Sequence, residues 1–257
     1  MSILFHNSIF GPLKSRRLGI SLGVNLLPSN GKICTFNCIY CECGWNRNGK
    51  PTGTLADKAE VEQALEERLT SLRGTELEPD SITFSGNGEP TLHPQFPAII
   101  DSTLRLRDRL CPKAKVSVLT NGTRVFEPTI FAALQKVDNN IIKLDGGTMH
   151  CIDALDQPNI QFDLKAYIDQ LKRFNGNLII QTLFLRGHHN GMVIDNTTDE
   201  EVRLWLEHLA SIQPKRVMMY VIERETPEQD LEKIDKEELE HIAEKVRKLG
   251  IETDIYA

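Results

Sequence analysis

The chain has 257 residues and a mass of 29.1 kDa; 40% of its residues are hydrophobic, 26% are charged, and its mean hydropathy is -0.29. These values are typical of a globular protein with a full core, and they exclude disorder, collagen-like repeats and coiled coil. No run approaches the ~18 consecutive apolar residues of a membrane span, and no basic region precedes the short apolar run at the N-terminus, so we expect a cytoplasmic protein without membrane contact.

Basic side chains are concentrated at the N-terminal end. Residues 1–50 have a net charge of +5 and the remaining residues a net charge of -11, which together give the -6 of the whole chain. The basic residues of this segment are Lys14, Arg16, Arg17, Lys32, Arg47 and Lys50. Such an end would attract an anionic substrate, a nucleic-acid backbone or an acidic electron donor, and solvated loop charges are the alternative.

Short apolar runs alternate with amphipathic segments along the chain. Strands are predicted at 19–27, 81–85, 115–120, 140–144, 177–185 and 216–222, and 251–256 is a candidate seventh strand. Helices are predicted at 56–72, 95–109, 127–135, 162–174, 199–211 and 235–249, three of them stopped by Gly74, Gly176 and Gly250. This alternation predicts one α/β domain over 1–257 with a mostly parallel sheet, in which 1–33 form an N-terminal extension and the first strand.

Polar, glycine-rich motifs follow the predicted strands. In chain order they are the cysteine loop at 34–43, GNGEPT, TNGT, DGGT, RGHHNG and ERET. The C-terminal ends of parallel strands share one mouth in a barrel, whereas an open doubly wound sheet would gather ligands at one switch point. The spread of motifs therefore favours a partial (β/α)6-type TIM barrel with its active site at the C-terminal mouth.

Three cysteines in the loop have the spacing CxxxCxxC. These are Cys34, Cys38 and Cys41. A structural zinc site normally takes four Cys or His ligands from paired short loops, and no such partner follows in the sequence. Three thiolates on one tight loop instead suit a [4Fe–4S] cluster whose fourth iron has no protein ligand and can bind a cofactor or substrate.

The spacing resembles the radical S-adenosylmethionine (SAM) superfamily. The likeness rests on the cysteine triad, on the aromatic Tyr40 just before its last cysteine, on GNGEP at the next strand end, and on the order of elements. It implies a [4Fe–4S] cluster and SAM as cofactors, a low-potential electron donor of the flavodoxin or ferredoxin type, and an enzyme. The implied reaction cleaves SAM reductively to methionine and a 5'-deoxyadenosyl radical that abstracts hydrogen from a substrate.

Residues at the strand ends are candidates for binding SAM. In the run Gly86, Asn87, Gly88 and Glu89, the missing side chains of the glycines would let a ligand approach the backbone, and Glu89 would add charge complementarity. The resemblance implies that this run and Tyr40 bind the cofactor. Thr120 and Asn121 could meet the ribose or the methionine carboxylate, with a plain turn at the start of a helix as the alternative.

Charged residues on the fourth and fifth strands are candidates for the active site. Lys143 and Asp145 alternate to one face at the mouth, where barrel interiors are usually apolar, so we interpret them as catalytic rather than as a structural ion pair. Gln181 and Arg186 are weaker candidates for the cofactor. The remaining conspicuous residues have simpler interpretations: isolated Cys43 and Cys151 as small buried side chains, His188 and His189 as side chains pointing apart, and 223–244 as a solvated acidic segment.

The substrate is left open. The opening GPLKSRRLGISLGVNLLP before the triad resembles the branch with wyosine-type tRNA-modifying synthases, here as a single-cluster member because no cysteine precedes Cys34. RNA, a nucleotide or a small anionic molecule would suit the basic end. A glycyl-radical-enzyme activase or a peptide-modifying enzyme is the alternative, and a non-catalytic iron–sulfur or zinc module ranks last.

Overall fold

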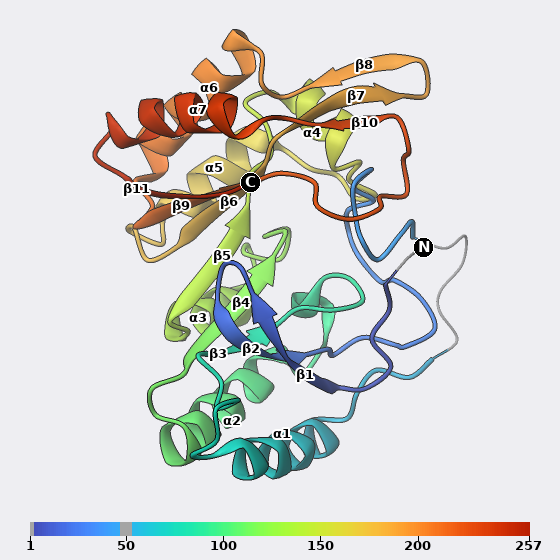
Figure 1. Ribbon diagram of the computed structural model, residues 1–257, viewed down its shortest axis with the longest axis vertical. Coiled ribbons are helices and arrows are strands. Elements are labelled where there is room, and N and C mark those ends of the chain that lie inside the picture. The colour runs from blue at the N-terminus through green and yellow to red at the C-terminus, as the bar shows by residue number, and fades with distance from the viewer. Residues whose placement is uncertain (1–2, 47–52) are drawn as a thin grey trace.

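The computed structural model describes residues 3–46 and 53–257, and it alternates strands and helices as predicted (Figure 1). The strands are β1 (Ile9–Ser15), β2 (Gly19–Val24), β3 (Ser81–Phe84), β4 (Lys115–Thr120), β5 (Asn139–Lys143), β6 (Ile179–Leu183), β7 (Leu185–His189), β8 (Met192–Asp195), β9 (Arg216–Tyr220), β10 (Leu231–Lys233) and β11 (Glu252–Tyr256). The helices are α1 (Lys58–Leu72), the 3-10 turn η1 (Pro90–Leu92), α2 (Phe96–Leu110), α3 (Pro128–Lys136), α4 (Met149–Leu155), α5 (Leu164–Lys172), α6 (Asp199–Ile212) and α7 (Lys236–Arg247).

The main sheet is a curled half barrel. Among the described residues its eight strands run in the order β1-β2-β3-β4-β5-β6-β9-β11. Every neighbouring pair is parallel except β1 with β2, and β1 and β11 are the two unpaired edges. The partial barrel is therefore confirmed, and the candidate seventh strand is β11.

The fifth predicted strand is wrong at its C-terminal end. The run 177–185 divides into β6 and β7 because Asn196 binds the backbone on both sides of the break: its side chain donates to the carbonyl of Leu183 (2.7 Å) and accepts from the amide of Leu185 (2.9 Å). The RGHHNG motif consequently lies in the hairpin of a second sheet, ordered β10-β7-β8 (Figure 1), and its His189 stacks on Trp45 of the cysteine-loop segment (ring centroids 5.7 Å apart).

Helix ends follow the local signals in the sequence. Several helices begin at a side chain that accepts a hydrogen bond from a backbone amide in the first turn, which are Asp57, Thr148, Asp163, Thr198 and Asp235. Gly74 and Gly250 follow α1 and α7 with φ of +72° and +77°, as the predicted glycine stops require.

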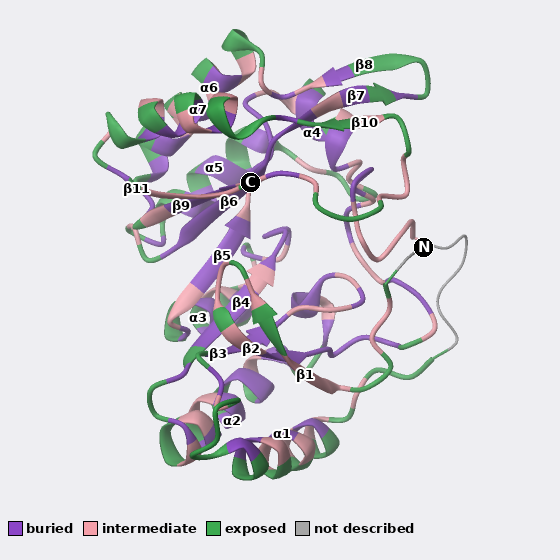
Figure 2. Cartoon of the chain, viewed as in Figure 1, coloured by how far each residue is buried: buried purple, intermediate pink, exposed green. Residues whose placement is uncertain are grey.

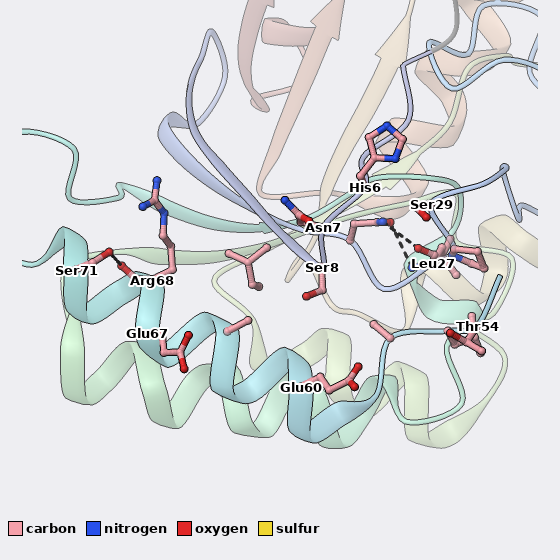
Figure 3. Close-up of a pocket in the computed structure, with 16 residues that line it drawn as sticks. His6, Asn7, Ser8, Leu27, Ser29, Thr54, Glu60, Glu67, Arg68 and Ser71 are labelled. Carbon is pink, nitrogen blue, oxygen red and sulfur yellow. Dashed lines mark hydrogen bonds between the residues drawn. The ribbon is translucent and has the colours of Figure 1, made fainter.

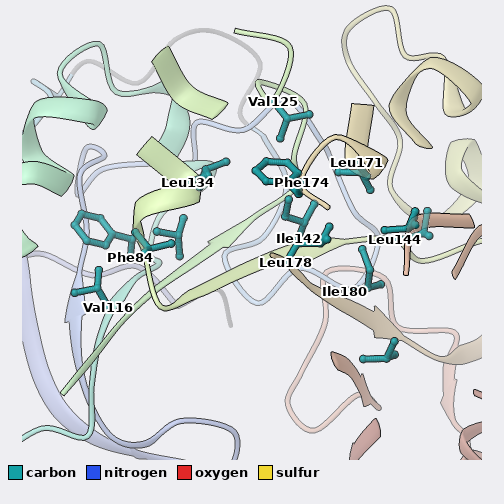
Figure 4. Close-up of a cluster of buried hydrophobic side chains, with 14 of the residues drawn as sticks. Phe84, Val116, Val125, Leu134, Ile142, Leu144, Leu171, Phe174, Leu178 and Ile180 are labelled. Carbon is teal, nitrogen blue, oxygen red and sulfur yellow. The ribbon is translucent and has the colours of Figure 1, made fainter. Parts of the chain in front are cut away.

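The core lies between the outer face of the sheet and the helices. Buried strand residues such as Phe84, Val116 and Ile142 pack there against helical residues such as Leu134 and Leu171 (Figure 4). The strands of the main sheet are largely coloured as buried in Figure 2. A smaller apolar cluster of Ile141, Ile179 and Met218 lies on the opposite face, covered by Leu18 from the β1–β2 turn. In residues 3–46 and 53–257 no helix has both the length and the apolar character for crossing a membrane.

Candidate functional site

The cysteine loop is fastened to the end of the neighbouring strand β3. Ile33, which precedes Cys34, forms a parallel bridge with Gly88. The amide of Ile33 donates to the carbonyl of Asn87 (2.9 Å), and its carbonyl accepts from the amide of Glu89 (2.9 Å). The two motifs that stood out in the sequence are therefore in direct backbone contact at the C-terminal edge of the half barrel.

The glycines of this run make room for protein. A Cβ on Gly88 would lie 1.8 Å from the carbonyl oxygen of Ile33, and one on Gly86 would lie 2.5 Å from the side-chain oxygen of Asn25. Their φ values of +131° and +137° also favour glycine. The expectation that the missing side chains expose the backbone to a ligand is wrong as a reason for these glycines, because neighbouring chain already fills both spaces.

Glu89 lies at the centre of a network of neutral donors. Its carboxylate accepts from the amide and hydroxyl of Thr91 (3.1 and 2.6 Å), from the hydroxyl of Thr120 (2.6 Å) and from the amide of Asn121 (2.7 Å). The side chain is 2% exposed, and burial raises the pKa of its carboxyl. The structure thus brings Glu89, Thr120 and Asn121 together, as the sequence predicts.

Two asparagines tie other segments to this network. Asn87, which is fully buried, exchanges two hydrogen bonds of 2.8 Å with the backbone of Phe5 and donates to the carbonyl of Pro28 (2.9 Å). Asn121 Nδ2 lies 3.5 Å from the sulfur of Cys34. Asn87 therefore holds the N-terminal segment, and Asn121 orients the first cysteine.

A second buried network lies on the Cys38 side of the loop. Lys143 Nζ donates to Asp145 Oδ2 (2.8 Å) and lies 3.7 Å from Asp156 Oδ1, and the hydroxyl of Tyr40 contacts both Lys143 and Asp145. Cys38 Sγ lies 3.1 Å from Asp156 Oδ1. Asp156 is fully buried and its Oδ2 has no hydrogen-bond partner among the described residues. The sequence analysis missed Asp156, since one aspartate at the end of a short helix carries no motif.

Neighbouring groups in this second network determine which side chains are charged. Burial favours the neutral amine, yet the carboxylate of Asp145 and its negative neighbours raise the pKa of Lys143 well above its usual value. Burial, and then the charge of Asp145, raise the pKa of Asp156 to about 7. Lys143 is consequently a persistent ammonium donor.

The three thiols have unequal environments. Burial raises the pKa of Cys34 to about 12, and burial together with the charge of Asp156 raises the pKa of Cys38 well above its usual value. The neighbouring thiol of Cys43 lowers the pKa of Cys41 to about 5. Cys41 is thus the thiol that ionises first in the cluster-free protein.

Lys32 is a residue of this loop that the sequence analysis counted only as a charge. It is 3% exposed, and its Nζ donates to the carbonyl of Gly44 (3.1 Å). Burial opposes its charge, but the negative charges of the cysteines, Cys41 first, raise its pKa. Its position two residues before the first cysteine was the signal that could have identified it.

Gln181 and Arg186 lie in different places. Gln181 is paired in register with Lys143 inside the half barrel and accepts from Arg17 (3.0 Å). Arg186 lies in the second sheet, where it contacts Glu238 and donates to Thr197 (2.6 Å). The structure therefore places Gln181 beside the predicted site and Arg186 outside it.

The N-terminal charges are largely used within the fold. The guanidinium of Arg17 lies 4.7 Å from the ring centroid of Tyr220, Arg16 pairs with Glu223, and Lys32 is buried. Arg47 and Lys50 lie outside the described residues. Of the four basic residues that the structure describes in this segment, Lys14 is exposed, and Arg16 is exposed but paired.

The acidic segment 223–244 is only partly a solvated face. Arg224 donates to Glu42 (2.5 Å), and the amide of Glu228 donates to the carbonyl of Ile39 (3.1 Å). The carboxylate of Glu228 also pairs with His189 (2.5 Å). The first part of the segment is therefore fastened against the cysteine loop.

The remaining candidates have ordinary partners. Cys43 donates to the carbonyl of Gly86 (3.1 Å), and Cys151 is buried. His188 is exposed and lies 3.3 Å from Asp230, whereas His189 is buried, so the two rings lie on opposite faces of β7.

The donor set of the loop is the type that an iron–sulfur cluster takes. Across residues 3–46 and 53–257, no three His, Cys, Asp or Glu side chains are grouped to hold one metal ion. A tetrahedral zinc site needs its ligands to converge on one point, whereas a [4Fe–4S] cluster spreads its thiolates over separate irons. Three cysteines on one loop, with Lys32 among them, fit the cluster.

Two pockets lie near this region. One of about 750 Å³ lies between the N-terminal segment and α1, with His6 and Ser8 on one side and Glu60 and Arg68 on the other (Figure 3). None of the predicted site residues lines it. A second, of about 310 Å³, is formed by the cysteine loop, including Cys41, and by the segment 225–229.

Comparison with known proteins gives related sequences. The family model described as the radical SAM superfamily matches residues 31–209. The chain is 30% identical over 236 residues to a protein named GTPase Obg from Brachyspira hyodysenteriae, covering 90% of the chain and 32% of that protein. It is 30% identical over 219 residues to a UPF0026 protein of Helicobacter pylori, covering 84% of the chain and 66% of the relative. The chain thus spans less than two thirds of the length of both relatives.

Solved structures share the fold. A radical SAM methyltransferase from Sphaerobacter thermophilus matches with a TM-score of 0.64 and 17% identity, covering 92% of this chain and 65% of that one. TYW1 with a lysine-pyruvate adduct bound matches with a TM-score of 0.61 and 15% identity, covering 89% and 73%. At these identities the likeness extends to the fold alone.

Proposed function

The chain belongs to the radical SAM superfamily, and on that premise we propose that it is an enzyme holding a [4Fe–4S] cluster on Cys34, Cys38 and Cys41. The observation that carries the proposal is the backbone contact between the triad loop and the Gly86–Glu89 run at the mouth of the half barrel. When bound, the cluster and SAM supply a one-electron cleavage that yields methionine and a 5'-deoxyadenosyl radical able to take hydrogen from a substrate.

The Glu89 side of the loop is the proposed binding side for SAM. The carbonyl of Gly86 already accepts a hydrogen bond from Cys43, so it faces the cysteine loop and can accept from an ammonium group instead. Glu89 adds a buried negative charge there. Because its oxygens are occupied by neutral donors, it acts by orienting Thr120 and Asn121.

The Lys143 side is the proposed substrate side. Lys143 and Asp145 hold the hydroxyl of Tyr40, and Gln181 lies beside Lys143 on the next strand. A lysine that forms a carbonyl adduct must react as the neutral amine. Lys143 is held as an ammonium by two carboxylates, so we assign it hydrogen bonding and charge rather than an adduct like that of TYW1.

The class of chemistry requires an electron donor, and the substrate is a separate proposal. A flavodoxin or ferredoxin type of donor supplies the low-potential electron, and the substrate is RNA, a nucleotide or a small anionic molecule. Activation of a glycyl-radical enzyme and modification of a peptide are the competing uses of the same radical. A pull-down that recovers RNA, a large glycyl-radical protein or a peptide distinguishes them.

Anaerobic reconstitution tests the proposed function. The wild type should bind about four irons and four sulfides, as one [4Fe–4S] cluster requires. The dithionite-reduced protein should then convert SAM slowly to 5'-deoxyadenosine and methionine without its substrate. The triple variant Cys34, Cys38, Cys41→Ala should bind no cluster. A complete reduced cluster that neither binds nor cleaves SAM would leave only electron transfer or a structural role.

A further inference from the structure

Lys32 is a buried cation without a carboxylate partner. Its side chain is 3% exposed, and no Asp or Glu of the described residues forms an ion pair with it. The nearest acidic residue of its own loop, Glu42, is engaged with Arg224. Lysine is almost never fully buried unless it is paired. The negative partners of this ammonium must therefore be sought among the sulfur atoms.

The contacts of Lys32 join the start of the cysteine loop to its end. Nζ donates to the carbonyl of Gly44 (3.1 Å), and the amide of Gly44 donates to the carbonyl of Cys41 (2.8 Å). The side chain thus runs from the start of the loop to its end and leaves its charge beside a predicted ligand. A solvated loop charge would instead extend into water.

We propose that Lys32 is the charge-compensating residue of the iron–sulfur site: its ammonium balances the thiolate ligands and makes the cluster easier to reduce. This inference rests on the proposed function. Three thiolates on a [4Fe–4S] cluster leave a net negative charge, and one electron from a low-potential donor makes that charge more negative without forming or breaking a bond. A fixed cation beside the cluster favours the reduced state. Lys32 acts through Cys41 and is a positioning residue.

The test is a redox titration of the reconstituted protein without SAM, followed by the electron paramagnetic resonance signal of the reduced cluster. Lys32→Met removes the charge at similar size, Lys32→Gln removes the charge but keeps a donor for Gly44, and Lys32→Arg keeps the charge. Lys14→Met, at an exposed lysine of β1, is the control. The neutral variants should have a midpoint potential at least about 59 mV more negative, a tenfold change in the one-electron equilibrium. Lys32→Arg and Lys14→Met should stay near the wild type.

Each outcome decides the inference. A neutral variant with a full iron content and the wild-type potential overturns it. The neutral variants could fail to take up iron although both unfold at the wild-type temperature as apoproteins. In that case a Lys32→Arg variant that keeps the cluster supports the inference, and a Lys32→Arg variant that loses the cluster overturns the inference. A wild type that binds no cluster defeats the proposed function itself, which separates the two failures.

Discussion

Two buried carboxylates flank the cysteine loop, and they are built in opposite ways. Glu89 accepts four hydrogen bonds from neutral groups of Thr91, Thr120 and Asn121. Asp156 shares one oxygen among Cys38, Tyr40 and Lys143, and its other oxygen has no partner in the described part of the chain. The first carboxylate is saturated, and the second keeps an unused acceptor.

This difference indicates two roles: one carboxylate fixes the shape of the barrel mouth, and the other can take part in recognising a bound molecule. A buried acceptor with all its donors in place fixes the positions of the segments that supply them. A buried acceptor without a donor is unfavourable unless another group, such as a water or a ligand, completes it. We therefore interpret the Glu89 side as the rigid frame of the mouth and the Asp156 side as the part that a bound molecule completes.

The largest effect is expected at Gly88, in the rigid frame. In Gly88→Ala the new Cβ meets the backbone oxygen of Ile33 at 1.8 Å, and φ is +131°. We expect a loss of at least about 3 kcal/mol in the free energy of unfolding, together with loss of the cluster, because Ile33 precedes Cys34. Urea unfolding and iron content measure both.

Gly74→Ala is the matched control. Gly74 has a positive φ of +72°, but apart from its chain neighbours no described atom lies within 4 Å of the position that its new Cβ would take, so only backbone strain of about 1 to 2 kcal/mol applies. Equal losses in the two variants would show that the contact with Ile33 contributes nothing.

Exchanging a carboxylate for an amide tests the saturation of Glu89. In Glu89→Gln either orientation of the amide turns its NH2 group toward a backbone N–H, that of Thr91 or that of Asn121. One buried donor then lacks an acceptor, which destabilises the fold by about 2 to 3 kcal/mol. Urea unfolding should show a much smaller effect for Glu66→Gln, since the side chain of Glu66 is about half exposed (47%) and paired with Arg109 (2.6 Å). A neutral Glu89→Gln would mean that the network is not saturated.

The same exchange at Asp156 should behave differently. In Asp156→Asn the NH2 group can occupy the position of the unpartnered oxygen, so we expect a change within about 1 kcal/mol near pH 5. The pKa of Asp156 is raised from 3.8 to about 7 on folding. Between these values the folded protein binds a proton that the unfolded chain has released, so stability falls as pH rises.

The variant isolates this pH dependence. From pH 4 to 7 the cluster-free wild type should lose stability relative to Asp156→Asn, with a difference of about 1 kcal/mol per pH unit and no further divergence above pH 7. Urea unfolding at several pH values gives the difference directly. If the two proteins lose stability equally with pH, Asp156 is ionised in the folded protein over the whole range. That outcome would contradict the raised pKa that we attribute to its burial beside Asp145.

The sequence predicted the fold well because its signals are local. Apolar runs and glycine stops located the strands and helices of the half barrel, and the helix caps agree with them. The second sheet escaped prediction because it depends on Asn196, whose side chain binds the backbone of β6 and β7 from 13 and 11 residues away. No periodicity within 177–185 carries that information.

For the site residues too, the sequence predicts what depends on local signals and misses what depends on distant contacts. Spacing singled out the cysteines as candidate ligands, and strand ends singled out Glu89, Asn121 and Lys143 as candidates, which the fold brings around the loop. The sequence does not predict that Asp156 contacts Lys143 or that Lys32 is buried in the loop. Both depend on which side chains turn inward, and a net charge does not show that. The glycines were recognised for a wrong reason, since the chain that fills their space lies 55 residues or more away in the sequence.

The smallest effect is expected for an ion pair that belongs to neither carboxylate network. Arg16 and Glu223 form an ion pair with side-chain exposures of 40% and 46%, and such pairs contribute less than about 1 kcal/mol because water and salt screen them. Arg16→Gln should therefore shift the urea midpoint slightly at low salt and not at all at 1 M salt, where the Debye length is about 3 Å. Its cluster spectrum should match the wild type, since Arg16 contacts neither carboxylate network. A loss above about 2 kcal/mol, persisting in high salt, would show that the pair braces the β1–β2 turn against the barrel, and the rigid frame would then extend beyond the Glu89 side.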